Sequence, residues 1–218
     1  MLHKETVERR TLELLKALMQ DEALKDFALV GGTALSLYMG HRKSVDLDLF
    51  SQHIFQVDKL RDHLYEKYGF TALNMADVTL IGVIDDIKVD CLYYKYPLVE
   101  PVNEIEKIRL TSMPDIAAMK LTAIAQSGTR LKDFVDVAFL STKMSFNDML
   151  NAFREKFPRT NIVGVTKSLL YYNDIDFSAE IDLITGKYNW KDIAKRLQAM
   201  FDNPDTLFLT PPLHGIKQ

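Results

Sequence analysis

The sequence predicts an α/β (α+β) fold, in which a core built on a short mixed sheet is followed by a helical C-terminal part. Two observations carry this prediction. Short runs rich in β-branched and aromatic residues, which are typical of strands, lie in the first half of the chain. After Pro101 the pattern changes to apolar residues at helical spacing. We therefore expect an α/β core with an N-terminal helix over residues 1–110 and a helical domain over residues 111–218.

The core is expected to begin with an amphipathic helix, because apolar residues recur at helical spacing over residues 6–19. The next elements are predicted in this order: a strand over 27–30, a helix that runs from a glycine turn to Met39, a strand over 45–50, a helix over 57–68, and two strands over 78–84 and 87–94. The last two strands flank Asp85-Asp86, so we expect a hairpin there, although Asp-Asp is a weaker turn signal than Asp-Gly.

The C-terminal part reads as a series of helices. Ser112-Met113-Pro114-Asp115 has the form of a capping box, in which a serine and an acid three residues later satisfy the first amides of a helix. We expect that helix over 116–126, a break at Gly128 and a second helix over 130–140. Three or four further helices are predicted between residues 146 and 201, followed by a partly extended tail over 204–218.

The charge of the chain does not favour a nucleic-acid-binding surface. Residues 1–140 carry 17 Lys and Arg against 21 Asp and Glu, and residues 141–218 carry 10 against 9. Neither part is the strongly basic patch that binds nucleic acid by releasing counterions. An RNA substrate remains open through a local basic surface, but the composition does not argue for it.

The sequence also predicts a soluble, cytoplasmic protein. Its single cysteine, Cys91, cannot form an internal disulfide, which fits a reducing compartment. The N-terminus lacks the pattern of a secretory signal peptide, and no apolar run approaches the roughly 18 residues of a membrane span. We therefore expect no membrane partner.

Three aspartates are the first candidates for chemistry. Asp46 and Asp48 are two apart in a predicted strand, so both carboxylates are expected on one face. Two such carboxylates repel each other unless a cation lies between them, and Mg²⁺ takes one or two carboxylates together with substrate phosphates. Asp90 lies inside the apolar run Val89-Asp90-Cys91-Leu92, where an acid is costly unless it is paired or bound to metal. The alternative for Asp46 and Asp48 is a solvated pair on an exposed edge strand.

The glycine pair Gly31-Gly32 is the second candidate. Glycines after a strand let the backbone approach a phosphate closely, and the helix N-terminus that follows offers amides and the positive end of the helix dipole. A plain strand-to-helix turn is the alternative. Together with the aspartates, the pair forms a far more specific pattern than either part alone.

These motifs resemble a known signature. The segments Val30-Gly31-Gly32, Asp46-Leu47-Asp48 and Val89-Asp90-Cys91 resemble the nucleotidyltransferase superfamily pattern of a glycine turn, an Asp-x-Asp and a third acid on a later strand. More narrowly, the Gly-Gly-Thr-Ala-Leu turn and the run over residues 42–50 are similar to the AbiEii/AbiGii toxin family. The resemblance covers residues 25–140. It implies a nucleotidyltransferase fold with Mg²⁺ (or Mn²⁺) held by Asp46, Asp48 and Asp90.

The resemblance also implies roles for residues further along the chain. Lys120 matches the third motif of the family, in which a lysine contacts the triphosphate, whereas from its apolar helix alone it would be expected to extend to solvent. Lys132-Asp133-Phe134-Val135-Asp136 matches the fourth motif, and either Asp133 or Asp136 is then functional. The alternative is a solvated i,i+4 pair between Lys132 and Asp136.

The nucleotide is expected to contact Gly31, Gly32 and Thr33 and the segment that precedes the Asp-x-Asp. In that segment Arg42, Lys43 and Ser44 are candidates for phosphate or base contacts, with a solvated loop as the alternative, and function is favoured for Arg42. The tyrosines of two aromatic clusters are expected to pack rather than to stack on bases; they are Tyr93, Tyr94, Tyr96, Tyr171 and Tyr172.

The predicted reaction is attack of an acceptor hydroxyl on the α-phosphate of a nucleoside triphosphate, with release of pyrophosphate. Asp46 and Asp48 would hold the metal, Asp90 would also act as general base, and Lys120 would offset developing negative charge. The resemblance further implies the toxin of a toxin–antitoxin pair, with an antitoxin protein as partner and RNA, such as the acceptor end of tRNA, as substrate. The alternatives are a non-catalytic nucleotide-binding or interaction module and a nucleotidyltransferase of the antibiotic-modifying type.

Overall fold

The computed structural model describes residues 1–213, and its chain divides into two compact units. The first unit comprises Met1–Pro97 and Pro101–Thr111. The second comprises Leu98–Glu100 and the chain from Ser112 onward. The sequence predicts one boundary near residue 110, but not the excursion of Leu98–Glu100 into the second unit. The last five residues of the predicted tail lie outside the described part.

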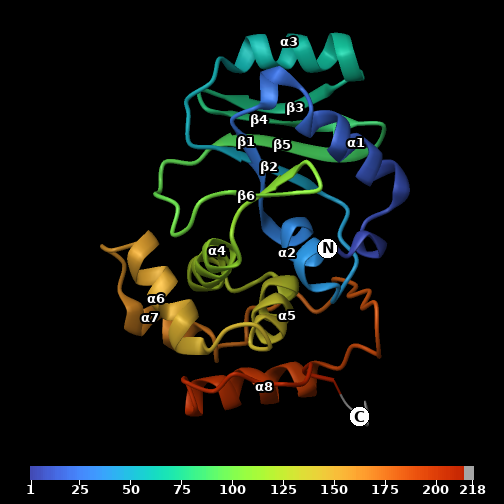
Figure 1. Ribbon diagram of the computed structural model, residues 1–218. Helices are drawn as coiled ribbons and strands as arrows, with labels where there is room; N and C mark the ends of the chain where they lie inside the picture. Colours follow the sequence, from blue (N-terminus) through green and yellow to red (C-terminus); the bar gives the residue numbers. More distant parts are fainter. Residues whose placement is uncertain (214–218) are drawn as a thin grey trace. The chain divides into compact units, whose positions relative to one another are not determined.

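A seven-stranded mixed sheet forms the centre of the first unit (Figure 1), as the α/β prediction requires. Its order is β3-β4-β5-β2-β1-β7-β6. The pairs β2/β5 and β1/β7 are parallel, and the other neighbours are antiparallel. The bounds are β1 Phe27–Leu29, β2 Leu47–Ser51, β3 Thr71–Ala76, β4 Thr79–Ile84, β5 Ile87–Tyr93, β6 Asn103–Ile105 and β7 Ile108–Leu110.

Three of these strands were not expected from the sequence. Strand β3 lies at the edge of the sheet and is largely exposed, so it lacks the alternation of buried and exposed residues that marks a strand. Strands β6 and β7 have three residues each, which is too short for any periodicity. The predicted hairpin is confirmed: β4 pairs with β5, and Asp85 and Asp86 take the positive φ values of 48° and 66° that a tight two-residue turn needs.

The helices of the first unit are α1 (Arg9–Met19), α2 (Gly31–Met39) and α3 (Val57–Tyr68). Figure 1 shows α3 on one side of the sheet and α2 on the other. The end of α1 is tied to α3 by Asp21, whose carboxylate accepts hydrogen bonds from His63, Lys67 and Tyr68. Helices α1 and α3 therefore lie on the same side.

The alternation of β2 and β5 divides the sheet into an apolar face and a polar face. Leu47 and Leu49 of β2 pair in register with Val89 and Cys91 of β5, and all four side chains are fully buried. The intervening residues, including Asp48 and Asp90, must then face the other side. Because α2 begins beside Asp48, this polar face is the one toward α2.

The second unit is helical, as expected. Its helices are α4 (Met113–Gln126), α5 (Leu131–Leu140), α6 (Phe146–Lys156), α7 (Ile162–Ser168) and α8 (Trp190–Asp202). Ser112 caps α4 by accepting a hydrogen bond from the Asp115 amide. The Asp115 carboxylate accepts from the amides of Val99 and Glu100 and from the buried Lys156 ammonium, at 2.6 Å. These bonds attach the short segment Leu98–Glu100 to the second unit.

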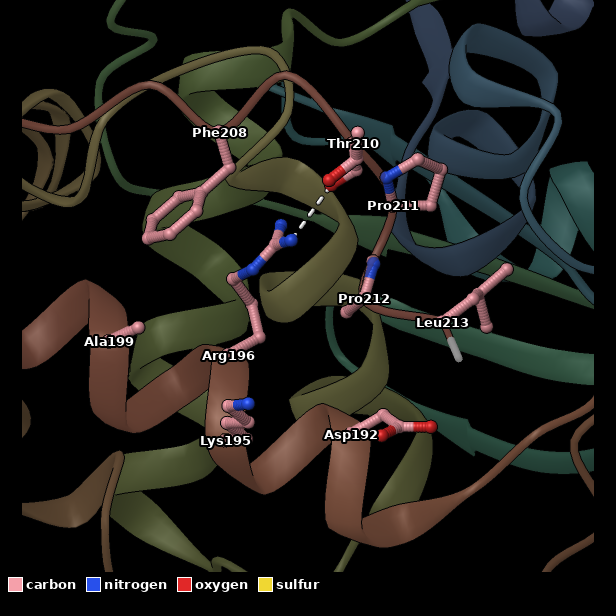
Figure 2. Close-up of a pocket in the computed structure, with 9 residues that line it drawn as sticks. All are labelled: Asp192, Lys195, Arg196, Ala199, Phe208, Thr210, Pro211, Pro212 and Leu213. Atoms are coloured by element: carbon pink, nitrogen blue, oxygen red, sulfur yellow. Dashed lines mark hydrogen bonds between the residues drawn. The ribbon is translucent and has the colours of Figure 1, made fainter. Parts of the chain in front are cut away.

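Arg196 of α8 binds the tail that follows this helix (Figure 2). The Arg196 guanidinium donates to the Ser141 hydroxyl at 2.9 Å and to the Thr210 carbonyl at 2.8 Å, and it lies 4.2 Å from the centre of the Phe208 ring. Arg196, Phe208 and Thr210 border a cavity of about 300 Å³, whose wall also includes Asp192 and Lys195. No helix in the described part of the chain is both long and apolar enough to cross a membrane.

Candidate active site

Asp48 and Asp90 are brought side by side by the parallel pairing of β2 and β5. The two residues are direct register partners, and therefore share one face of the sheet. Strand β2 lies between β5 and β1, so Asp48 is not on an edge strand. The strand predicted over 45–50 begins only at Leu47, so Asp46 directly precedes it and is exposed. Asp48 is half-buried and Asp90 is buried.

A lysine that sequence reasoning missed joins this group. The Lys88 ammonium donates to Asp90 Oδ2 at 2.6 Å. This hydrogen bond raises the pKa of Lys88, and the negative charges of Asp90, Asp48 and Asp46 raise it further. One ammonium thus lies in the field of all three predicted acids. The signal was present in the sequence, since Lys88 is two residues before Asp90 in the same predicted strand and must share its face.

The glycine turn lies directly against the acids. Helix α2 begins at Gly31 itself, with φ +69°, and no side chain caps its N-terminus. A Cβ at Gly31 would lie 2.6 Å from Asp48 Oδ2, so a side chain there would both strain the backbone and clash with the carboxylate. The Val30 amide donates to the Asp48 carbonyl at 2.9 Å. Glycine turn and Asp-x-Asp therefore form one local structure.

The segment before β2 is also attached to the first turn of α2. Thr33 Oγ1 donates to the Asp46 carbonyl at 2.5 Å and lies 2.8 Å from the Ser44 hydroxyl. The Arg42 guanidinium lies so close to Gly32 that a Cβ there would be 2.5 Å from Nη2. Arg42 is only 3% exposed, so it does not belong to a solvated loop, whereas Lys43 is exposed. Thr33, Arg42 and Ser44 therefore brace the acids and the glycine turn.

The second unit carries its own charged cluster, formed by Lys120 of α4 with Asp133 and Asp136 of α5. The Lys120 ammonium is 2.6 Å from Asp133 Oδ1 and 2.7 Å from Asp136 Oδ2. The three side chains are 8%, 2% and 0% exposed, respectively. Lys120 therefore does not extend to solvent, and Asp136 does not form a solvated pair with Lys132. Both acids of the fourth motif contact the same ammonium.

The acids of the first unit fit a divalent metal in their chemistry. Asp90 Oδ1 is buried and has no hydrogen-bond partner within the described residues, which is costly for a carboxylate oxygen unless a cation or substrate group binds it. Its neighbour in register is a second carboxylate. No three His, Cys, Asp or Glu side chains of residues 1–213 are arranged as a ready-made metal-ligand set. The register partners Asp48 and Asp90 match the needs of Mg²⁺, which typically takes one or two carboxylates and completes its shell with water and substrate phosphates.

Comparisons with known proteins identify the fold and the family of this chain. An uncharacterized protein of Aquifex aeolicus, aq_aa25, is 33% identical over 168 residues, which are 74% of this chain and 81% of the relative. Two crystal structures from Helicobacter pylori share the fold at 19% identity. One is a candidate nucleotidyltransferase, with a TM-score of 0.56 over 89% of this chain and 94% of its own. The other is JHP933, with a TM-score of 0.53 over 90% and 92%. The family model described as nucleotidyl transferase AbiEii toxin, type IV TA system, matches residues 13–208. The chain therefore belongs to the AbiEii family of nucleotidyltransferase toxins.

Proposed function

We propose that this protein transfers a nucleoside monophosphate from a nucleoside triphosphate to an acceptor hydroxyl. One observation above all supports the proposal: Asp48 and Asp90 are in register on the polar face of the sheet, and the Asp48 carboxylate touches the glycine turn that begins α2. In this proposal the acids bind a cation, and the neighbouring backbone amides bind a phosphate. Membership of a nucleotidyltransferase family points to the same chemistry.

Asp46 and Asp48, with Asp90 beside them, would hold Mg²⁺ or Mn²⁺. When bound, the metal would offset the charge of the triphosphate and of the three acids, which repel one another. Without the metal the Lys88 ammonium offsets part of that charge, because it is hydrogen-bonded to Asp90 and lies near the other two acids. Gly31 leaves the space that the Asp48 carboxylate needs.

The triphosphate would bind at the start of α2. The amides of Gly31, Gly32 and Thr33 lie in the first turn of a helix that no side chain caps, so the helix favours an anion there. Arg42 lies beside Gly32 and adds a positive charge with little freedom to move, because it is buried. Lys43 and Ser44 complete the proposed contacts.

Asp90 would accept the proton of the acceptor hydroxyl. The hydroxyl oxygen forms a bond to the α-phosphorus, the bond from that phosphorus to the bridging oxygen breaks, and pyrophosphate leaves with the electron pair. The hydrogen bond from Lys88 to Oδ2 fixes the Asp90 carboxylate and leaves Oδ1 to receive the proton. Lys88 is a positioning residue in this proposal.

Lys120 keeps its proposed role as a cation that contacts the phosphates, and this role rests on the family pattern. Asp133 and Asp136 both form ion pairs with the Lys120 ammonium. These two contacts would fix the position of the ammonium for that role. We assign both acids to the positioning of Lys120 rather than choosing between them. Each is buried, and each makes a charge-assisted contact of 2.6–2.7 Å.

The family description also supports a role as the toxin of a toxin–antitoxin system. We propose a separately encoded antitoxin as partner and RNA, such as the acceptor end of tRNA, as the substrate. The two rival functions, a binding module without turnover and an enzyme that modifies small molecules, are outcomes of the experiment below.

The test is to incubate the protein with each labelled nucleoside triphosphate, Mg²⁺ or Mn²⁺, and either total RNA or small-molecule acceptors. We expect pyrophosphate release and covalent label on RNA. The double variant Asp46→Asn/Asp48→Asn should lose both products, whereas Asp77→Asn, at an exposed turn of the same unit, should keep them. Label on a small molecule alone would favour the antibiotic-type enzyme. Nucleotide binding without either product in any combination would favour the binding module.

A further inference from the structure

Three aromatic side chains form a continuous row beside the proposed catalytic acids. The rings of Phe50 and Tyr94 are stacked, with centroids 5.1 Å apart and an angle of 29° between their planes. The Tyr96 ring follows, 5.4 Å from that of Tyr94. We call these three residues the aromatic row. All of them belong to the first unit, so their arrangement relative to the acids is determined.

The row lies on the polar face of the sheet and continues the line of the acids. Phe50 is two residues after Asp48 on β2, and the burial of β2 alternates strictly, so the two side chains share a face. Tyr94 is four residues after Asp90 and donates its amide to the Ser51 carbonyl at 2.7 Å, which continues the pairing of β5 with β2. At roughly 3.3 Å per residue, Phe50 is about 7 Å and Tyr94 about 13 Å along the strands from the acids.

The row is most exposed at Tyr96, and a lysine ammonium lies beside that ring. Phe50 and Tyr94 are half-buried, and Tyr96 is 38% exposed. The ammonium of the exposed Lys95 lies 5.4 Å from the centre of the Tyr96 ring. The Gln52 side chain donates to the Tyr96 carbonyl at 2.7 Å, which fixes the backbone at the far end of the row. Aromatic side chains of the hydrophobic core are more deeply buried than this row: Phe70 and Phe134 are 1% and 0% exposed.

We propose that the aromatic row binds the terminal nucleobases of a single-stranded polynucleotide acceptor. Rings that lie in sequence and are at least partly exposed, with a lysine beside them, are how proteins hold single strands, because every base has a face that stacks and every linkage has a phosphate. The proposal rests on the function proposed above and names the class of acceptor. It replaces the expectation from sequence that Tyr94 and Tyr96 serve only for packing.

The position of the row favours the acceptor over the nucleoside triphosphate. Across the sheet the order is β1, β2, β5, and the glycine turn follows β1, on one side of Asp48. Asp90, the acid that would receive the acceptor proton, is on β5, on the other side. Tyr94 continues the Asp90 strand. A chain end that presents its hydroxyl to Asp90 would therefore lay its base on the row, while the triphosphate occupies the turn.

The experiment measures binding, so it does not depend on turnover. Two fluorescent five-residue RNA strands are compared by anisotropy: one ends in adenosine, and the other lacks the base of its 3′-terminal residue. The native protein should bind the first about tenfold more tightly, the effect of a single stacked base. Tyr94→Leu and Tyr96→Leu should each reduce this preference several-fold. Tyr94→Phe should retain it, as should Tyr65→Leu, which removes an exposed tyrosine from α3.

A parallel titration with Mg²⁺–ATP and with Mg²⁺–tripolyphosphate distinguishes the two possible sources of a base. We expect the tyrosine variants to bind both as the native protein does. If instead Tyr94→Leu weakens ATP but not tripolyphosphate, and leaves the RNA preference intact, the row holds the base of the triphosphate and the proposal is wrong. Equal binding of both RNA strands by the native protein would also overturn it. Because Tyr96 is exposed, Tyr96→Leu decides the matter if Tyr94→Leu does not fold. If the protein transfers no label but still prefers the RNA strand with its terminal base, and loses this preference in the tyrosine variants, the aromatic row binds bases as proposed. Only the proposed transferase function is then refuted.

Discussion

Replacement of Lys120 should show how much the buried charge cluster contributes to stability. The Lys120 ammonium lies between the carboxylates of Asp133 and Asp136, and all three side chains are at most 8% exposed. Replacement by methionine keeps most of the side-chain volume but leaves two buried carboxylates facing each other without a cation. Breaking a buried ion pair in this way costs about 3–5 kcal/mol. For a chain of this size, each kcal/mol lowers Tm by roughly 2–4 °C, so Lys120→Met should lower Tm by about 6–20 °C.

The assay is thermal unfolding followed by circular dichroism, with urea unfolding as a second measurement. The matched control is Lys132→Met, which removes an exposed lysine one residue before Asp133 and should change stability by no more than about 0.5 kcal/mol. Asp136→Asn should cost less than Lys120→Met, because Lys120 keeps Asp133 as its partner. If Lys120→Met unfolds at the same temperature as Lys132→Met, the three charges do not form the buried cluster described here.

The remaining predictions concern the first unit. Gly31→Ala should abolish Mg²⁺-dependent nucleotide binding in calorimetry, because its Cβ meets the Asp48 carboxylate; Gly69→Ala, which has a similar φ of +70° but open space, should bind normally. Burial alone would raise the pKa of Asp21, but hydrogen bonds from His63, Lys67, Tyr68 and the Ala23 amide together hold that pKa well below its usual range. The stabilisation is present above the unfolded pKa of about 3.9 and is lost progressively as pH falls toward the folded value, so Asp21→Asn should destabilise the protein at pH 7 and by a smaller amount at pH 3 in urea unfolding; an equal loss at both would contradict this. Cys91 is fully buried, which raises the pKa of its thiol, so it should react with a thiol reagent only when the protein unfolds; rapid labelling of the native protein would show that it is accessible.

The sequence determined most of what depends on local pattern. Helix α3 has the predicted bounds, and the hairpin of β4 and β5 forms at Asp85-Asp86. Periods of 2 and 3.6 residues and the chemistry of turns act over a few neighbours, so they can be recognised without knowing the fold. The glycine turn and the acids resemble the signature of the family, and the order of predicted strands and helices indicated the fold class; the comparisons confirm both.

The site itself was only partly predictable. That Asp46, Asp48, Asp90, Lys120, Asp133 and Asp136 carry the reaction stays a prediction. The alternation of β2 indicated which residues share a face with Asp48, but only the parallel pairing of β2 with β5 shows that Asp90 is its direct neighbour. Lys88 was missed although it shares the face of Asp90, because a charged residue near a strand end usually indicates only exposure to solvent.

The tertiary structure alone decided which charges meet across long separations in the chain. Lys120 read as a lone cation on an apolar helix that would reach solvent, whereas it is buried against two acids from the next helix. The same holds for Lys156, 41 residues from its partner Asp115, and for the aromatic row, which joins β2 to the residues after β5. The spacing of apolar residues within one helix or strand indicates on which face a side chain lies. The residue that it meets depends on how the elements pack, because a buried charge is stable only where a distant element supplies its partner.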